Sequence, residues 1–281
     1  MEDGQINAQD AVGQVSALPS VKDAADRRTA ISAVLIVKNE EAAIGFCLDA
    51  LKWCDEVVVV DSGSSDRTVE LARARGARVI VQEWMGYGKQ KDFAVRQAAN
   101  DWVLCVDADE IVSPELRASI ETVLHATSAG AYEMARCNRF MGRFLRHGEG
   151  YPDWNLRLFD RRRARWSDDP VHENVQTRET VGRLDGDLLH ESAESLQSYL
   201  EKQNRYTSLQ AEALYREGVH PSIVKLVLSP LVRFLKFYVF RLGFLDGMPG
   251  LIHIVIGCFN TFSKNAKLFD LQARGRTDSA R

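Results

Sequence analysis

The stretch Glu56-Val-Val-Val-Val-Asp-Ser-Gly-Ser-Ser-Asp-Arg-Thr68 decides the fold. A strand with one solvent-exposed face alternates polar and apolar residues, and the four successive valines of this stretch do not. This pattern predicts a strand covered on both faces. The run ends at Asp61, and small polar residues follow before a helical pattern begins. A buried strand, a polar turn and a helix in this order indicate one unit of a parallel α/β sheet.

The same order recurs from Ala30 to about Thr127. Strands are expected at 31–37, 56–61, 78–81 and 102–107, and helices at 40–53, 65–75, 89–99 and 113–124. Ser113 followed by Pro114 is typical of a helix start, because serine caps the helix and proline suits its first position. We therefore expect an α/β fold with a mostly parallel central sheet flanked by helices.

Composition divides the chain into four parts. Residues 1–29 are polar and lack the apolar core of a secretion signal, so a flexible extension is expected. Residues 30–130 hold the strand–helix repeat, and residues 131–195 are typical of strands and loops. Residues 196–281 are expected to form a C-terminal helical extension.

Residues 222–245 of this extension carry four basic side chains and no acid among mostly apolar residues. A fresh helix is expected from Ser229-Pro230. No uninterrupted apolar run approaches the roughly 18 to 20 residues of a membrane-spanning helix. The pattern favours a basic amphipathic segment on the inner face of the cytoplasmic membrane. The alternative is a helix that covers the sheet or a second copy in a homodimer.

The 281-residue chain has 36 basic and 39 acidic residues, a formal charge of -3, and 45% hydrophobic residues. This balance excludes a wholly disordered chain and a generally basic nucleic-acid-binding protein. The five cysteines form no CxxC pair, which favours reduced thiols in the cytoplasm. One local basic cluster, Arg161-Arg-Arg-Ala-Arg165, suits either a phosphorylated acceptor or a solvated surface.

Polar residues follow three of the four expected strands, at the edge where parallel sheets bind ligands. They are Lys38, Asn39 and Glu40 after the first strand, Asp61 and Gly63 after the second, and Asp107, Ala108 and Asp109 after the fourth. Neither GxGxxG nor GxxxxGK[ST] follows a strand, which disfavours dinucleotide and P-loop sites. Asp61 is expected to accept hydrogen bonds from a nucleoside, and Gly63 leaves room for the nucleotide to approach.

The Asp107-Ala108-Asp109 element suits a metal site. Alternate residues of an extended chain project to one side, so both carboxylates can face one point. Mg²⁺ and Mn²⁺ take oxygen ligands, and one or two carboxylates plus substrate phosphates usually hold them. The two acids are therefore expected to hold a cation that neutralises a diphosphate leaving group.

Three segments resemble the signature motifs of family 2 glycosyltransferases, which have the GT-A fold. They are Val34-Leu-Ile-Val-Lys-Asn-Glu-Glu41, Val59-Val-Asp-Ser-Gly-Ser-Ser-Asp-Arg-Thr68 and Val106-Asp-Ala-Asp-Glu110. Within this family, the chain looks most like bacterial lipopolysaccharide core β-1,4-glucosyltransferases. That narrower resemblance also draws on Trp154-Asn-Leu-Arg-Leu-Phe159, Pro170-Val-His-Glu173 and Leu189-His190.

The resemblance implies an inverting transfer of a hexose, with glucose expected, from a UDP-sugar to a lipopolysaccharide-core or other lipid-linked glycan. It implies a carboxylate base, for which Glu173 is the first choice and Asp168 and Asp169 are rivals. The basic helix that begins at Lys89 is implied to lie near the sugar diphosphate. His190 is implied to complete the metal site, and Trp154, Arg157 and His172 to contact the acceptor.

Three other functions stay open at this point. A polyprenyl-phosphate sugar transferase fits the basic apolar tail. A nucleotidyltransferase shares the sheet and the metal-binding acids, but it normally has a glycine-rich basic loop after its first strand. A non-catalytic nucleotide-sugar-binding protein is disfavoured because both acids of the metal motif are present.

Overall fold

The computed structural model describes residues 28–126, 128–169, 173–192 and 195–279. A mixed nine-stranded sheet has the order β3-β2-β1-β4-β8-β6-β11-β5, with β7 paired to β6. Its strands are β1 (Ile31–Val37), β2 (Glu56–Asp61), β3 (Arg78–Val81), β4 (Trp102–Cys105), β5 (Glu110–Val112), β6 (Ala131–Phe140), β7 (Arg143–Phe144), β8 (Asp153–Asp160) and β11 (Val181–His190). A small separate sheet pairs β9 (Ala164–Trp166) with β10 (Val175–Thr177).

The first half of the sheet confirms the predicted strand–helix repeat. Strand β1 pairs in parallel with β2 and β4, and β2 pairs in parallel with β3. The intervening helices are α2 (Ile44–Asp49), α3 (Thr68–Ala74), α4 (Tyr87–Gln97) and α5 (Pro114–His125). Helix α2 covers only part of the predicted 40–53 helix, because turns form on both sides of it.

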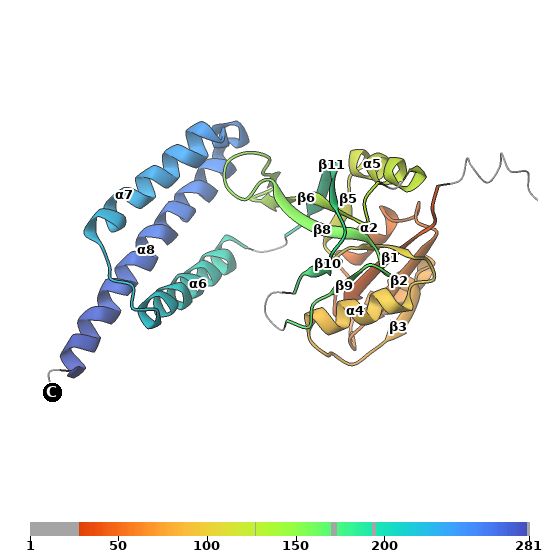
Figure 1. The fold of residues 1–281 in the computed structure, drawn as a ribbon, viewed down its shortest axis with the longest axis horizontal. Coiled ribbons are helices and arrows are strands. Elements are labelled where there is room, and N and C mark those ends of the chain that lie inside the picture. The colour runs from red at the N-terminus through yellow and green to blue at the C-terminus, as the bar shows by residue number, and fades with distance from the viewer. Residues whose placement is uncertain (1–27, 127, 170–172, 193–194, 280–281) are drawn as a thin grey trace, which may run out of the picture.

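Helices cover both faces of these strands, as the unbroken valine run predicts. Leu35, Val59 and Leu104 belong to one buried cluster, which includes residues of α2 and α5. Val58 and Val103 belong to a second cluster with residues of α4 and the β9 region. Figure 1 shows α2 and α5 above the sheet and α4 below it. The sheet is therefore the middle layer of three.

Beyond β4 the sheet becomes mixed. Strand β8 runs antiparallel between β4 and β6, and β11 is parallel to β6 but antiparallel to β5. The fourth predicted strand ends at Cys105 rather than at Asp107. The chain turns there, and the Glu110 amide donates a 3.0 Å hydrogen bond to the Asp107 carbonyl. This turn places the acidic motif beyond the end of the strand.

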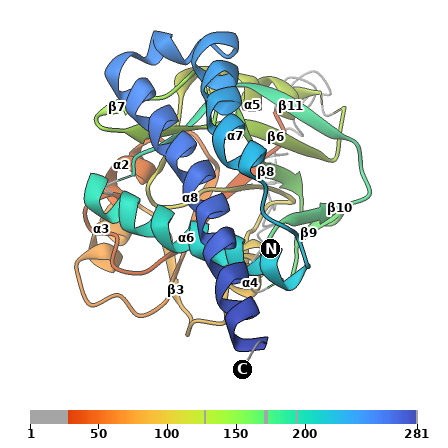
Figure 2. The same ribbon diagram turned by 90° about the vertical axis from the view of Figure 1, so that its left-hand side faces the viewer.

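The chain continues into the expected C-terminal helices. They are α6 (Leu196–Arg216), α7 (Ile223–Phe234), a π-helical turn η1 (Leu235–Phe240), a 3-10 turn η2 (Gly243–Asp246) and α8 (Gly247–Ser279). Helix α8 packs against both α6 and α7. Figure 2 shows α7 beside the first part of α8, and α6 lying across α8 farther along.

One prediction for this region is wrong. Pro230 does not start a helix, because α7 already begins after Ser222, whose hydroxyl accepts a hydrogen bond from the Lys225 amide. The stretch Gly243–Arg274, which comprises η2 and most of α8, is long and apolar enough, by length and composition alone, to cross a membrane. The expected absence of a spanning helix rested on uninterrupted apolar runs, which His253 and Asn260 break, and it stays a prediction.

The segment 147–151 joins the helices to the sheet domain. The buried Asp246 carboxylate accepts a 2.8 Å hydrogen bond from the His147 amide. The Gly148 amide donates to the Arg241 carbonyl at 2.8 Å, and the Arg241 side chain donates to the carbonyl of Tyr151 at 2.7 Å. The helical extension is thus bonded to a loop of the sheet domain.

Candidate active site

A pocket of about 590 Å³ lies where the ends of β1, β4 and β11 meet. Seven of the predicted site residues line it: Lys38, Glu40, Asp107, Ala108, Asp109, Glu173 and His190. They come from four distant parts of the chain. The order of the strands in the sheet brings them together, because β4 and β11 lie apart in the sequence and both end at this edge.

Asp107 is held by two cations. Its Oδ2 accepts a 2.8 Å hydrogen bond from Arg157 Nη2, and its Oδ1 lies 3.5 Å from Lys91 Nζ. Burial alone would raise the pKa of Asp107, but the charges of Arg157 and Lys91 outweigh it and hold this pKa well below its usual range. Asp107 therefore stays ionised at the edge of the pocket.

Arg157 lies beneath the acidic motif, with only 4% of its surface exposed. Its Nη2 also lies 3.4 Å from Oε1 of the fully buried Glu110, whose Oε2 accepts a hydrogen bond from the Asp107 amide. Among the described residues, its Nη1 has no hydrogen-bond partner. Its predicted contact with the acceptor stays a prediction, since Arg157 lines neither this pocket nor the surface of the acidic turn. Arg157 positions Asp107 from below.

Asp109 and His190 form the part of the site that suits a metal ion. Asp109 Oδ2 lies 3.0 Å from His190 Nε2, and His190 Nδ1 lies 2.8 Å from Asn138 Oδ1. Adjacent ligands of an octahedral Mg²⁺, each at about 2.1 Å, lie roughly 3.0 Å apart. The spacing therefore fits one ion between Asp109 and His190. Within the described ranges, no cluster of three or more His, Cys, Asp or Glu forms a complete protein cage.

Glu173 is the predicted base that faces the pocket. It lies 3.5 Å from Lys91 Nζ, and its side chain is 21% exposed. Asp168 and Asp169 are exposed and do not line this pocket. His172 lies outside the described residues. Glu40 lines the opposite wall, where burial and then the charge of Asp109 raise its pKa.

Several predicted residues shape the site without lining it. Asp61 is 2% exposed, and its Oδ2 accepts hydrogen bonds from the Gly63 and Ser64 amides, both at 3.0 Å. Asn39 has a positive φ of 57° and accepts a hydrogen bond from the Ser65 amide. These contacts brace the loops after β1 and β2. The predicted role of Asp61 toward a nucleoside stays a prediction.

Sequence reasoning selected the wrong lysine of α4. Lys89 is exposed and does not line the pocket, whereas Lys91, two residues later, is buried and contacts Asp107 and Glu173. Helical periodicity could have found it, because Lys91 shares the buried face of α4 with Ala94 and Val95. The site prediction also left out Glu110, which lies beneath the pocket, and the lining residues Ile36, Val37, Ser62, Trp84 and Tyr87.

Two other predicted features lie away from this pocket. Trp154 does not line it, and the Arg183 guanidinium stacks 4.6 Å from its ring centre. The cluster at residues 161–165 precedes β9 and includes its first two residues. There Arg161 bonds backbone carbonyls of α4 and the residue after it, while Arg162 pairs with Asp160 and Asp101. This cluster is therefore partly neutralised by the protein itself.

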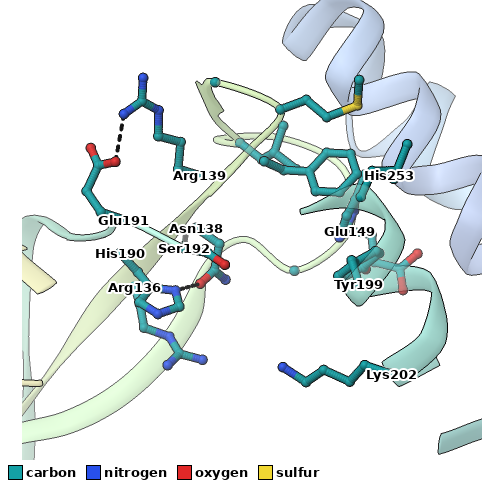
Figure 3. Close-up of a pocket in the computed structure, with 16 residues that line it drawn as sticks. Arg136, Asn138, Arg139, Glu149, His190, Glu191, Ser192, Tyr199, Lys202 and His253 are labelled. Atoms are coloured by element: carbon teal, nitrogen blue, oxygen red, sulfur yellow. Dashed lines mark hydrogen bonds and ion pairs between the residues drawn. The ribbon is translucent and has the colours of Figure 1, made fainter. Parts of the chain in front are cut away.

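A second pocket of about 620 Å³ lies on the other side of His190, which lines both cavities. Figure 3 shows it between the end of the sheet and the helices α6 and α8. It is lined by basic, acidic and aromatic side chains from both parts of the molecule.

Replacing Arg157 with methionine should lower the free energy of unfolding by about 3 kcal/mol near pH 7, because Asp107 and Glu110 lose their shared cation. Arg157→Met and the wild type are compared by urea unfolding at several pH values. The native pKa of Asp107 is depressed, so its stabilisation exists above the unfolded pKa and is lost as the pH falls.

The difference between the two proteins should therefore stay nearly constant from pH 7 to about 5 and shrink as the pH falls below about 4, the unfolded pKa of an aspartate. Arg165→Met, which removes an exposed arginine of β9, is the matched control and should change the stability by less than about 0.5 kcal/mol. A penalty that does not depend on pH would contradict the assigned ion pair.

Comparisons with known proteins identify one family. The family model described as glycosyl transferase family 2 matches residues 32–183, more than half of the chain. An uncharacterized glycosyltransferase of Rickettsia typhi is 34% identical over 259 residues, which cover 88% of this chain and 89% of that protein. The lipopolysaccharide core biosynthesis glycosyltransferase LpsC of Rhizobium meliloti is 32% identical over 262 residues, which cover 89% and 97%.

Among solved structures, glucosyl-3-phosphoglycerate synthase of Mycobacterium tuberculosis aligns with a TM-score of 0.44 and 22% identity, covering 71% of this chain and 84% of that one. The family match and the extended similarity to LpsC carry the assignment. This chain belongs to glycosyltransferase family 2.

Proposed function

We propose that this glycosyltransferase moves a hexose, with glucose expected, from a UDP-sugar to a lipopolysaccharide-core acceptor, with metal assistance and inversion at the anomeric carbon. One observation carries the proposal: the Asp107-Ala108-Asp109 turn, His190 and the candidate base Glu173 line the same pocket. Similarity to LpsC along 97% of that protein supports the acceptor class, because its name assigns that protein to lipopolysaccharide core biosynthesis.

Asp109 and His190 are the residues that would hold Mg²⁺ or Mn²⁺. Such an ion, when bound, would neutralise negative charge that develops on the leaving diphosphate. Asp107 stays ionised beside it, and Lys91 carries a positive charge toward the same space. Lys38 lines the donor side of the pocket.

Glu173 is the proposed general base. Its carboxylate takes the proton of the acceptor hydroxyl as the hydroxyl oxygen forms a bond to the anomeric carbon. On the opposite face of the sugar, the bond from the anomeric carbon to the diphosphate oxygen breaks, and UDP leaves with the electron pair. Lys91, 3.5 Å from both Glu173 and Asp107, orients the base relative to the acidic motif.

A polyprenyl-phosphate sugar transferase is the second candidate, because the helical extension exposes a large apolar surface. A nucleotidyltransferase is less well supported, since the turn after β1 is Lys38-Asn39-Glu40 and not a glycine-rich loop. A purely nucleotide-sugar-binding protein would not need the carboxylate of Glu173 in the pocket.

We further propose that the helical extension, residues 196–281, rests on the inner face of the cytoplasmic membrane, beside an acceptor-binding half formed by residues 131–195. Helix α7 has no buried residue, and Ile223, Leu231 and Val232 are each more than half exposed. Lys225 is an exposed cation of α7, and Lys236 follows in η1, whereas Arg233 pairs with Glu149 and Arg241 donates to the Tyr151 carbonyl. A basic apolar surface suits anionic lipid. A homodimer through this face is the alternative.

Replacing Asp109 with asparagine should weaken the metal-dependent binding of UDP, because the ion loses a charged ligand. Titration of UDP with and without Mn²⁺ measures this effect, and we expect the stimulation by Mn²⁺ to fall roughly tenfold or more. Glu115→Gln, which neutralises an exposed acid of α5, is the control and should leave it unchanged. Full stimulation in Asp109→Asn would exclude the proposed metal site.

Replacing Glu173 with glutamine should lower kcat by about 100-fold or more, because the acceptor hydroxyl keeps its proton. UDP release from a panel of UDP-sugars, with deacylated lipopolysaccharide as acceptor, gives kcat, and UDP affinity should stay within about twofold. Asp168→Asn and Asp169→Asn test the two rival acids, which lie outside the pocket. If either rival abolishes turnover while Glu173→Gln does not, the base is misassigned.

The double variant Leu231→Glu, Val232→Glu should lose most of its binding to vesicles, because it places two charges in the apolar face of α7. Co-sedimentation with vesicles of phosphatidylglycerol and phosphatidylcholine measures the bound fraction. Val81→Glu changes an equally exposed apolar residue on β3 and should bind like the wild type. Unchanged binding of the α7 variant, or a shift from dimer to monomer instead, would favour the homodimer.

A further inference from the structure

The second pocket, which lies between the sheet and the helical extension, has one aromatic wall. The ring centres of Phe140 and Tyr199 lie 5.3 Å apart, and those of Phe140 and His253 lie 5.2 Å apart, both edge to face. Burial lowers the pKa of His253, so its ring is neutral at pH 7 and serves as part of this wall. Such a wall offers apolar ring faces and edges against which the faces of sugar rings can pack.

The facing wall is basic. Arg136 and Arg139 of β6 line it, and Figure 3 shows Lys202 extending from α6, one turn after Tyr199, toward the side where Arg136 and His190 lie. Arg139 pairs with Glu191 at 2.6 Å. The other acid of the pocket, Glu149, is already neutralised by Arg233 from outside the pocket. Arg136 pairs with Asp153, which lies outside the pocket, at 2.9 Å. The lining as a whole therefore has three Arg or Lys side chains and two Glu side chains, an excess of one basic group.

The two pockets meet at His190. Its Nε2 faces Asp109 in the first pocket, and its Nδ1 contacts Asn138, which lines the second. A ligand in the second pocket therefore has one end beside the acidic motif. The arginine cluster at residues 161–165 lacks this connection, because its cavity is lined by residues around β9 and β10 and by neither His190 nor Asp109.

We propose that this second pocket binds a negatively charged saccharide of the acceptor, and that the helical extension completes the site through Tyr199, Lys202 and His253. The inference rests on the proposed glycosyl transfer. The sugar ring packs against the aromatic wall, and its phosphate or carboxylate faces Arg136, Arg139 and Lys202. The volume of about 620 Å³ suits a ligand of this size.

The test measures binding of the deacylated inner-core oligosaccharide of a bacterial lipopolysaccharide by calorimetry, with UDP and Mg²⁺ present. Lys202→Glu should raise its Kd about tenfold or more, because a cation facing the anionic group becomes an anion. Tyr199→Ala should raise the Kd several-fold through loss of the aromatic wall. Arg205→Glu reverses a charge on the same helix outside the pocket and should stay within about twofold.

Dephosphorylated and carboxyl-reduced forms of the oligosaccharide identify the anionic group, since only loss of the recognised group should weaken binding. The affinity for UDP and the acceptor-independent release of UDP should be unchanged in the control Arg205→Glu. Wild-type protein that does not bind the oligosaccharide, or Lys202→Glu with an unchanged Kd, would overturn the proposal. Failure of the proposed transfer itself looks different, because UDP would then not be released although the oligosaccharide still binds.

Discussion

The site depends on a buried arginine between two carboxylates. Arg157 bonds Asp107 at the edge of the pocket and lies 3.4 Å from Glu110 beneath it. Without this cation, two acids within three residues would repel each other in a poorly solvated place. The ion pair also joins β8, which carries Arg157, to the turn after β4. The acidic motif therefore keeps its shape before any substrate or metal ion is bound.

The parallel half of the sheet could be predicted because its signal is local. An unbroken valine run between polar turns favours a strand covered on both faces. The polar turns and the periodic apolar residues after them indicate where the helices lie. The mixed half could not be predicted, since β8 inserts between β4 and β6 and the pairing of β11 with β5 joins residues about 80 positions apart. The helix start predicted at Pro230 was wrong because Pro230 lies inside α7. The Ser222 cap and the packing of α7 on α8 stabilise this helix despite the proline.

The candidate site was predictable where a motif follows a strand, as for Asp107, Asp109 and Lys38. It was not predictable where tertiary packing decides which way a side chain points. Arg157 was linked to the acceptor only through the family resemblance, and nothing in the sequence indicated that two acids would hold it in the core. Lys89 and Lys91 differ only in their position around α4, and the buried face of that helix selects the second.

The bonds from segment 147–151 to Arg241, Asp246 and Arg233 have a mechanical consequence. Segment 147–151, which lines part of the second pocket, is coupled by these bonds to the C-terminal helices, so that the two move together. A force on those helices, such as their seating in lipid, would be transmitted to the shape of that cavity. We therefore expect detergent or a bilayer to change the affinity for the acceptor more than the affinity for the nucleotide.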